Sequence, residues 1–259
     1  MLTTSATYRL IAGNLDRSLA MTQAEPPVAR ETEYYLKTIG GIRGIDDFIS
    51  DTRVFNYAMR AFGLDDMVHA KAFMRKVLTE GIEDEAAFAR RLADDRFLTF
   101  ALTFDFAARG VETTATNAAQ QRVVDRYVRQ VIEISAGEDN EGVRLALYFQ
   151  REAPKVASAY SLLADPALWQ VVTTLFGFPP EMAAADIDKQ AAAVLARLDL
   201  ADLKDPAKLD GLISRFTALW DVTEVAARDP LLVLFAPVPA PGVGADLIAT
   251  LQLLKHGGT

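Results

Sequence analysis

The residues best suited to metal binding or acid–base chemistry at neutral pH are two histidines, His69 and His256. Asp65 and His69 are four positions apart, so on a predicted helix they share one face and could supply two metal ligands. No third ligand follows at a recognisable spacing, and a solvated helix face with Asp65 near the positive end of the helix dipole explains the same pair. His256 lies in a short polar tail that we expect to be frayed.

Motifs for nucleophilic catalysis and phosphate binding are missing from the sequence. No serine stands in a Gly-x-Ser-x-Gly motif or beside a histidine. Gly242-Val243-Gly244 lacks the lysine and the preceding strand of a phosphate-binding loop. Three carboxylate pairs fall at predicted helix starts, where capping explains them: Asp46-Asp47, Asp65-Asp66 and Asp94-Asp95. We therefore expect a protein that is not an enzyme, with no catalytic residue, no cofactor and no metal.

Several basic residues have two interpretations each. Arg53 and Arg96 both follow a predicted helix cap by two positions. Each is either a first-turn arginine paired with the cap carboxylate or a neighbouring helix, or half of an ion pair between repeated units. Five further cations predict a modest basic face, which is either solvated or a docking surface for an acidic partner: Lys71, Arg75, Lys76, Arg90 and Arg91.

The composition is that of a folded protein that does not bind nucleic acid. Of 259 residues, 51% are hydrophobic and 24% charged, which allows a substantial core. The formal net charge is −8, whereas phosphate contacts need clustered Lys and Arg. Cysteine is absent, which fits a reducing compartment. The first residues lack a secretory signal, and the apolar run Leu231 to Ala236 is too short to span a bilayer. We expect a soluble, cytoplasmic protein without a membrane span.

A capped amphipathic helix, Asp51 to Leu64, is the element that the rest of the chain echoes. Asp51 suits the N-cap, where its carboxylate accepts hydrogen bonds from amides of the first turn. Gly63 suits the left-handed position that ends a helix. The apolar residues between them share one helical stripe: Val54, Phe55, Ala58, Met59 and Phe62.

Variants of this stretch recur along the chain. In the second copy, 43 residues later, Asp94, Arg96 and Ala101 match Asp51, Arg53 and Ala58. In the third, 114 residues after the first, Asp165, Trp169 and Gly177 match Asp51, Phe55 and Gly63. Tyr34-Tyr35 matches Tyr148-Phe149 at the same offset, and a weaker fourth copy runs from Leu212 to Trp220. The combined agreement of cap, stop and aromatic positions favours a duplication, although capped amphipathic helices also resemble one another.

The sequence predicts an all-α protein whose duplicated helical units pack as an orthogonal or bundle-like array, since no β-branched runs alternate with turns. A connecting helix is expected roughly from Ala118 to Ser135, followed by a loop from Ala136 to Gly142, and Pro179-Pro180 is expected to begin a long helix through Leu198. Three prolines in Pro237–Gly244 predict an extended arm. The expected divisions are N-terminal helices (1–44), a first repeat half (45–112), a connecting helix and loop (113–142), a second half (143–228) and a C-terminal arm and helix (229–259).

Several of these segments resemble the bacterial family called domain of unknown function 1217. They are Asn14–Leu19, Val28–Glu31, Glu33–Tyr35, Phe48–Arg53, Tyr57–Met67 and Ala70–Leu78, and the resemblance is strongest over residues 8–106. It implies an α-helical protein, found mainly in alphaproteobacteria, whose genes often lie among flagellar genes. No catalytic residues are established for the family.

Two functional hypotheses follow. The first is a non-enzymatic helical interaction protein linked to flagellar assembly or motility, as an adaptor, assembly factor or exported component, with the proline arm as a partner-binding or oligomerising segment. The second is a small-molecule or lipid-binding protein whose pocket between the halves is lined by Phe97, Phe100, Trp169 and Trp220. An ordinary core accounts for the same four aromatic residues and is the interpretation that the sequence favours.

Overall fold

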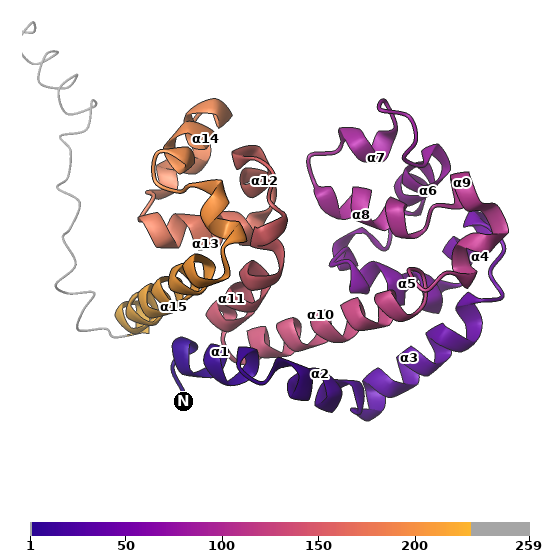
Figure 1. The fold of residues 1–259 in the computed structure, drawn as a ribbon, viewed down its shortest axis with the longest axis horizontal. Helices are drawn as coiled ribbons and strands as arrows, with labels where there is room; N and C mark the ends of the chain where they lie inside the picture. Colours follow the sequence, from indigo (N-terminus) through magenta and orange to yellow (C-terminus); the bar gives the residue numbers. More distant parts are fainter. Residues whose placement is uncertain (1, 229–259) are drawn as a thin grey trace, which may run out of the picture. The chain divides into compact units, whose positions relative to one another are not determined.

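The structure, a computed structural model, describes residues 2–228 (Figure 1). The arm and last helix predicted for 229–259, with their expected role in partner binding or oligomerisation, lie outside the described residues, as do His256 and Gly242-Val243-Gly244. Contacts along the chain divide it into one large unit, residues 1–221, and a second that begins at Val222.

Every regular element in residues 2–228 is a helix, which confirms the all-α prediction. The first α-helices are α1 (Thr4–Ala12), α2 (Leu15–Gln23), α3 (Pro26–Ile39), α4 (Ile45–Ser50), α5 (Thr52–Ala61), α6 (Lys71–Glu80), α7 (Phe88–Arg91), α8 (Asp95–Thr103) and α9 (Phe106–Arg109). They are followed by α10 (Gln121–Asp139), α11 (Glu141–Glu152), α12 (Ala159–Ala164), α13 (Pro166–Phe176), α14 (Ile187–Leu195) and α15 (Pro206–Arg228). Short 3-10 helices connect them: η1 (Asp65–Met67), η2 (Gly110–Ala115), η3 (Ala153–Lys155), η4 (Pro180–Ala184) and η5 (Leu200–Lys204).

Aspartates begin three of these helices as the sequence predicts. The Asp51 carboxylate accepts hydrogen bonds from the amides of Arg53 and Val54 at 3.1 and 3.0 Å, at the start of α5. At the start of α13, the Asp165 carboxylate accepts hydrogen bonds from the amides of Ala167 and Leu168 at 2.9 and 3.0 Å. Asp94 accepts from the amide of Arg96 at 2.9 Å and begins α8. Each cap satisfies amide donors that have no partner within their own helix.

Glycine ends α5 and α13 in the predicted left-handed conformation. Gly63 has φ +68° and Gly177 has φ +61°. After α5, the amide of Leu64 donates to the carbonyl of Met59, and that of Gly63 donates to Arg60, which is the Schellman pattern of a helix end. Because a Cβ is strained at positive φ, glycine is the residue that this turn favours.

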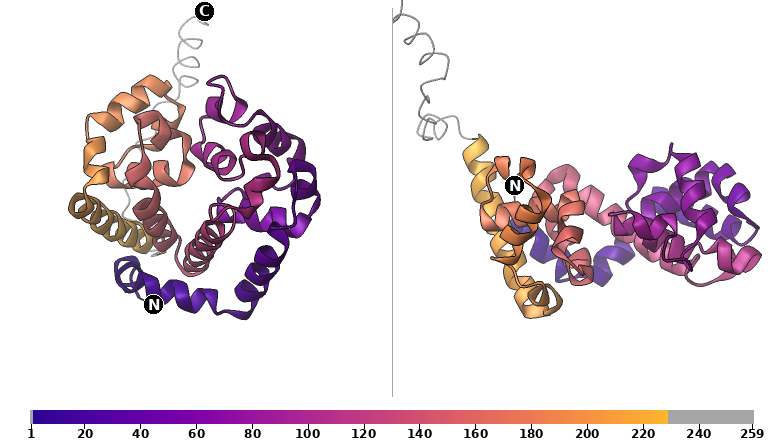
Figure 2. Two further views of the ribbon diagram at one scale, coloured as in Figure 1. Left: turned by 45° about the vertical axis from the view of Figure 1, so that its right-hand side comes forward. Right: turned by 90° about the horizontal axis from the view of Figure 1, so that it is seen from above.

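Most buried apolar residues of the described part of the chain belong to two clusters. The first contains Val28 of α3 and buried residues from Tyr35 through Val128, and the second contains Tyr8 and buried residues from Ile132 through Phe216. The long helix α10 contributes to both, since its first half packs in the first cluster and Ile132 packs in the second. Figure 2 shows the helices around this shared element from two further sides.

Equivalent contacts recur 114 residues apart. The phenol of Tyr34 donates to Asp51 Oδ2 at 3.3 Å, and the phenol of Tyr148 donates to Asp165 Oδ2 at 2.6 Å. The short helices before these caps, α4 and α12, also begin and end 114 residues apart. These correspondences agree with the predicted duplication, which stays a prediction.

Two local predictions were wrong because caps that the sequence analysis did not identify move the helix ends. The expected loop from Ala136 to Gly142 is helical, since α10 continues to Asp139 and Asn140 caps α11 through the amide of Gly142 at 2.9 Å. The helix expected from Pro179 is divided into η4 and α14, because Asp186 caps the latter. The weak fourth copy, Leu212 to Trp220, lies inside α15, whose first-turn amides bond Asp205, and the copy stays a prediction.

No helix in residues 2–228 is long and apolar enough to cross a membrane.

Candidate functional site

A cleft of about 330 Å³ brings together residues from both halves of the chain. One side comes from the end of α5, the start of α8 and α10, and the other from α11, η3, α12 and α13. Its apolar lining includes Phe62, Leu98, Leu102, Val156 and Leu168. Its charged lining consists of Asp94, Asp95, Arg96, Arg126, Arg151, Glu152, Lys155 and Asp165. The cleft therefore has both an apolar surface and several ionised groups.

Arg96 is held by contacts with two residues at the edge of the cleft. Its guanidinium pairs with both carboxylate oxygens of Asp94, at 3.0 Å from Nε to each and 2.7 Å from Nη2 to Oδ2. Its Nη1 donates to the carbonyl of Gly63, so it ties the start of α8 to the end of α5. The pKa of Arg96 is raised, because its hydrogen bond and charge contact with Asp94 outweigh the larger single effect of burial, which lowers it. Arg96 therefore serves packing between two helical units.

Tyr148 and Asp165 face the cleft from α11 and from the start of α13. The tyrosine donates to the same carboxylate that caps α13. Burial raises the pKa of Tyr148, and the charge of Asp165 and the bond to it raise the pKa further. The phenol is therefore kept protonated and acts as a donor, and the aspartate has its acceptor positions occupied.

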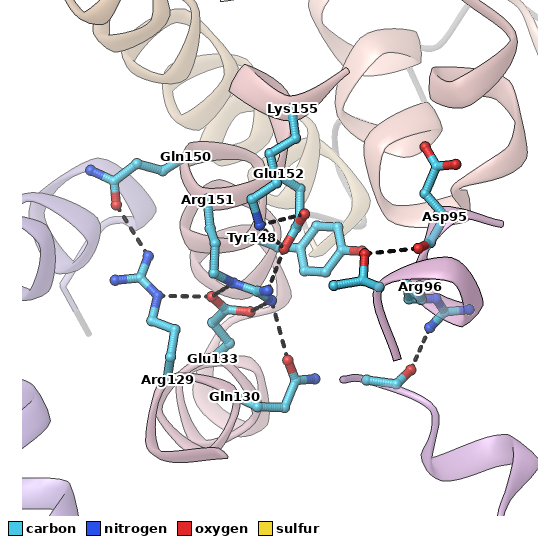
Figure 3. A network of polar contacts seen from close by, with 12 residues as sticks. Asp95, Arg96, Arg129, Gln130, Glu133, Tyr148, Gln150, Arg151, Glu152 and Lys155 are labelled. Atoms are coloured by element: carbon cyan, nitrogen blue, oxygen red, sulfur yellow. Dashed lines mark hydrogen bonds and ion pairs between the residues drawn. The ribbon is translucent and has the colours of Figure 1, made fainter. Parts of the chain in front are cut away.

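Beneath the cleft, two arginines share one buried carboxylate (Figure 3). Glu133 of α10, whose side chain is 1% exposed, accepts from Arg129 Nε at 2.9 Å and from Arg151 Nε and Nη2 at 2.8 and 2.7 Å. Arg129 also donates to Gln150 Oε1 at 3.2 Å and Arg151 to Gln130 Oε1 at 3.2 Å. We call these residues the α10–α11 network; it joins the two helices by directional contacts.

The network reaches the cleft through Arg151. Its Nη1 pairs with Glu152, and Lys155 donates to both oxygens of Glu152 at 2.9 Å. Burial lowers the pKa of Arg151, but the hydrogen bond and charge of Glu133 and the charge of Glu152 outweigh it, so the pKa is raised overall. Both cations are thus already neutralised by carboxylates of the protein.

Arg126 differs from the other cations of the cleft. It lies half-buried on α10, with its guanidinium 4.8 Å from the centre of the Phe62 ring. No carboxylate or other hydrogen-bond acceptor in residues 2–228 pairs with it. Burial lowers its pKa, and the positive charges of Arg151 and Arg122 lower it further, although Glu152 raises it. Asp95 likewise has a carboxylate without an ion pair or hydrogen bond in the described part of the chain.

The four aromatic residues considered for a pocket lining lie in or against the two cores, as the alternative interpretation of the sequence expects. Phe97 and Phe100 are buried in the first core, where their rings contribute to packing. Trp169 stacks on Phe178 with ring centroids 5.9 Å apart, and Trp220 packs against the second core. None of these residues lines the cleft. The spacing of apolar residues predicts which side chains are buried, but it does not distinguish a core residue from one that lines a cavity.

The remaining sequence candidates have structural contacts. Arg53 binds Glu31 of α3 through Nε at 2.8 Å and Nη2 at 3.0 Å, so it pairs with a neighbouring helix. Ala58 and Ala101 are buried in the first core. Asp65 pairs with Arg60 at 3.1 Å in η1, and His69 follows that short element, so the two predicted ligands do not share an α-helix. In residues 2–228 no group of three or more potential ligands gathers as a metal site would require.

Sequence reasoning did not identify Arg126, Glu133 or Arg151 as members of a site. One signal was present: Arg129 and Glu133 are four residues apart, a spacing at which helical side chains of opposite charge meet. The contacts of Arg151 and Arg126 depend on how α10 lies against α11 and α5, and no short sequence pattern specifies that packing.

Comparison with known proteins provides a family and a fold. The model of the family described as "Protein of unknown function (DUF1217)" matches residues 61–209, more than half of the chain. The chain is similar to a protein from Agrobacterium tumefaciens whose X-ray crystal structure is known, with 48% sequence identity. The match covers 86% of this chain and 97% of the Agrobacterium chain, and the two folds superpose with a TM-score of 0.79. None of the curated proteins compared with the chain matches it.

Proposed function

We propose that this chain, which belongs to the DUF1217 family of proteins of unknown function, is a non-enzymatic helical interaction protein of the cytoplasm. Its partners would be proteins of flagellar assembly or motility, for which it would act as an adaptor, an assembly factor or an exported component. The flagellar link rests on the family resemblance, because genes of that family often lie among flagellar genes. The use of the chain as an interaction protein rests on its surface.

The observation that carries this proposal is a set of exposed apolar side chains on α12 and α14. Tyr160, Ile187 and Leu195 are 50%, 55% and 53% exposed. The two helices pack together, and the phenol of Tyr160 donates to Asp188 at 2.7 Å, which places it next to Ile187. Tyr160 and Ile187 are thus neighbours on this surface, and Leu195 lies at the other end of α14. Neighbouring exposed apolar side chains, unlike scattered ones, are typical of a protein-binding face.

The test is capture of flagellar proteins from the bacterium that encodes the chain. We expect the full chain to recover them and the double variant Ile187→Asp, Leu195→Asp to lose most of them. Val111→Asp is the matched control, because Val111 is 57% exposed but lies in η2 of the first half. A chain ending at Asp229 separates this face from the predicted arm. If the full chain recovers no flagellar protein, or the double variant recovers as much, the proposal is wrong.

A second candidate function is binding of a small molecule between the halves. The cleft favours it, because about 330 Å³ lies within the range of ligand pockets and its lining combines apolar walls with a few polar groups. The pocket in this second candidate function is the cleft with its charged and apolar lining, and not the aromatic pocket that the sequence analysis considered.

A further inference from the structure

Arg126 is the starting point of a binding-site assignment in the cleft. The other cations that line the cleft are paired with carboxylates of the protein: Arg96 with Asp94, and Arg151 and Lys155 with Glu152. Arg126 alone among the cations lining the cleft lacks such a partner within residues 2–228. A half-buried guanidinium has lost part of its hydration, so an anion that replaces the missing water stabilises it more than at an exposed site.

The ring of Phe62 packs against this guanidinium. The guanidinium carbon lies over the ring, 4.8 Å from its centre, and Phe62 is itself 6% exposed. This contact occupies none of the N–H donors of the arginine as a carboxylate would, so they stay available to an anion. Two parallel N–H donors on the edge of a guanidinium match the two oxygens of a carboxylate.

The charges around Arg126 limit the charge that a ligand can carry. Arg151 is already paired with Glu133 and Glu152, so within residues 2–228 Arg126 supplies the positive charge that remains to be compensated among the cations of the lining. Asp94, Asp95 and Asp165 line the same cleft, so a ligand with several negative charges would meet repulsion there.

The walls of the cleft limit the rest of the ligand. Leu98 and Leu102 lie one turn apart on α8, and Val156 and Leu168 come from the second half of the chain. A volume of about 330 Å³ lies at the small end of the range of ligand pockets, about 300–1,000 Å³. The space therefore suits a small molecule with one charged end and a short apolar body.

We propose that the cleft binds a small monocarboxylate, whose carboxylate pairs with the edge of Arg126 and whose apolar body lies against Leu98, Leu102, Val156 and Leu168. This inference rests on the second candidate function and is independent of the protein-interaction proposal. The ligand's source is defined by its chemistry: one carboxylate and a short hydrocarbon chain.

The experiment is calorimetric titration of the purified full chain with straight-chain carboxylates from acetate to octanoate. We expect saturable binding that becomes about fourfold tighter for each methylene group buried. Alkylamines and primary alcohols of equal chain length test the charge, and inorganic phosphate tests selectivity for a carboxylate. We expect hexanoate to bind at least about tenfold more tightly than hexylamine or phosphate, the discrimination that about 1.4 kcal/mol gives.

Variants of two arginines test the assigned residue. Arg126→Gln is expected to weaken hexanoate binding at least about tenfold, and Arg126→Lys to retain part of it. Arg109→Gln, which changes an exposed arginine of α9 that does not line the cleft, is the control and should bind as the natural chain does. Thermal unfolding of each variant shows whether it is folded, so that lost binding is not confused with lost structure.

The outcomes separate the inference from the function on which it rests. Equal binding of carboxylate, amine and alcohol would overturn the carboxylate assignment while keeping a ligand cleft. Phosphate that binds as tightly as hexanoate would make the cleft a general anion site and would also overturn it. Hexanoate binding that is unchanged in Arg126→Gln would remove Arg126 from the site. If no probe binds, both the inference and the second candidate function are wrong, and the capture experiment is unaffected.

Discussion

Replacing Glu133 with glutamine should be among the most destabilising single changes that conserve side-chain size. Glu133 accepts three hydrogen bonds, one from Arg129 and two from Arg151, at a position where its side chain is 1% exposed. Glutamine keeps one acceptor oxygen, but an amide N–H₂ group replaces the second carboxylate oxygen. One N–H donor of Arg151 then faces another donor instead of an acceptor. Both arginines also lose the negative charge that they share.

The expected loss follows from these contacts. Removing one partner of a buried ion pair costs about 3–5 kcal/mol, because the charge left behind has no compensation. For a domain of this size, each kcal/mol lowers the melting temperature by about 2–4 °C, so the variant should melt about 6–20 °C below the natural chain. Urea unfolding at neutral pH, followed by circular dichroism, measures the free energy directly.

A matched control lies on the same helix. Glu138 is an exposed glutamate of α10, so Glu138→Gln should change stability by less than about 0.5 kcal/mol. Replacing the network by apolar residues, with Arg129→Met, Glu133→Leu and Arg151→Met together, should cost much less than Glu133→Gln, since no charge is then left unpaired. If Glu133→Gln costs less than about 1 kcal/mol, or no more than Glu138→Gln, the buried network does not hold α10 to α11.

Three further predictions concern local contacts. Tyr148→Phe should lower the unfolding free energy by about 1.5–3 kcal/mol and Tyr34→Phe by less, because the first phenol lies 2.6 Å from its aspartate and the second 3.3 Å; urea unfolding compares the two. Gly63→Ala should cost about 1–2 kcal/mol at φ +68°, whereas Gly211→Ala, inside α15 with open space around it, should stabilise by up to about 1 kcal/mol, and paired thermal melts test the difference. Burial, with a smaller contribution from Asp210, raises the pKa of Tyr8 from 10.0 to about 12, so as the pH rises the unfolded chain loses this proton before the folded chain does. The unfolding free energy should therefore be unaffected by this group below pH 10 and fall between pH 10 and 12. Unfolding experiments at pH 9 and 11 should show a smaller fall for Tyr8→Phe than for the natural chain.

Helix ends were predictable from the sequence because their signals are local. Asp51, Asp94 and Asp165 bond amides two or three residues ahead, and Gly63 and Gly177 adopt positive φ within the turn that they end. Such contacts depend on backbone geometry over a few residues, so residue type and spacing suffice.

The wrong helix limits have a related cause. Asn140 caps α11 immediately after α10 ends. The polar residues around it predict a loop, although only one residue separates the two helices. Asp186 has the same effect in the opposite direction, because one cap divides a stretch whose apolar spacing predicts a single helix. A polar residue near a helix end is compatible with a loop, a cap or an exposed turn, and packing decides between them.

The cleft could not be predicted because its residues come together only through packing. Arg126 contacts Phe62 of the preceding unit, and Arg151 contacts Glu133 across two helices. A charged residue on an amphipathic helix predicts exposure, yet both arginines lie partly below the surface. Their long aliphatic stems allow this, because the stem packs with apolar neighbours while the charged end reaches a partner.

The position of the α10–α11 network gives it a specific role. Along α10, Val128 belongs to the first apolar core and Ile132 to the second, and Arg129 and Glu133 follow these two residues. Burial of apolar surface is non-directional, so two cores that meet on one helix leave the angle between α10 and α11 weakly specified. Hydrogen bonds from two planar guanidinium groups to one carboxylate are directional and allow few arrangements. The network therefore specifies how the second half continues from the first, and through Arg151 it also positions one wall of the cleft in which Arg126 lies.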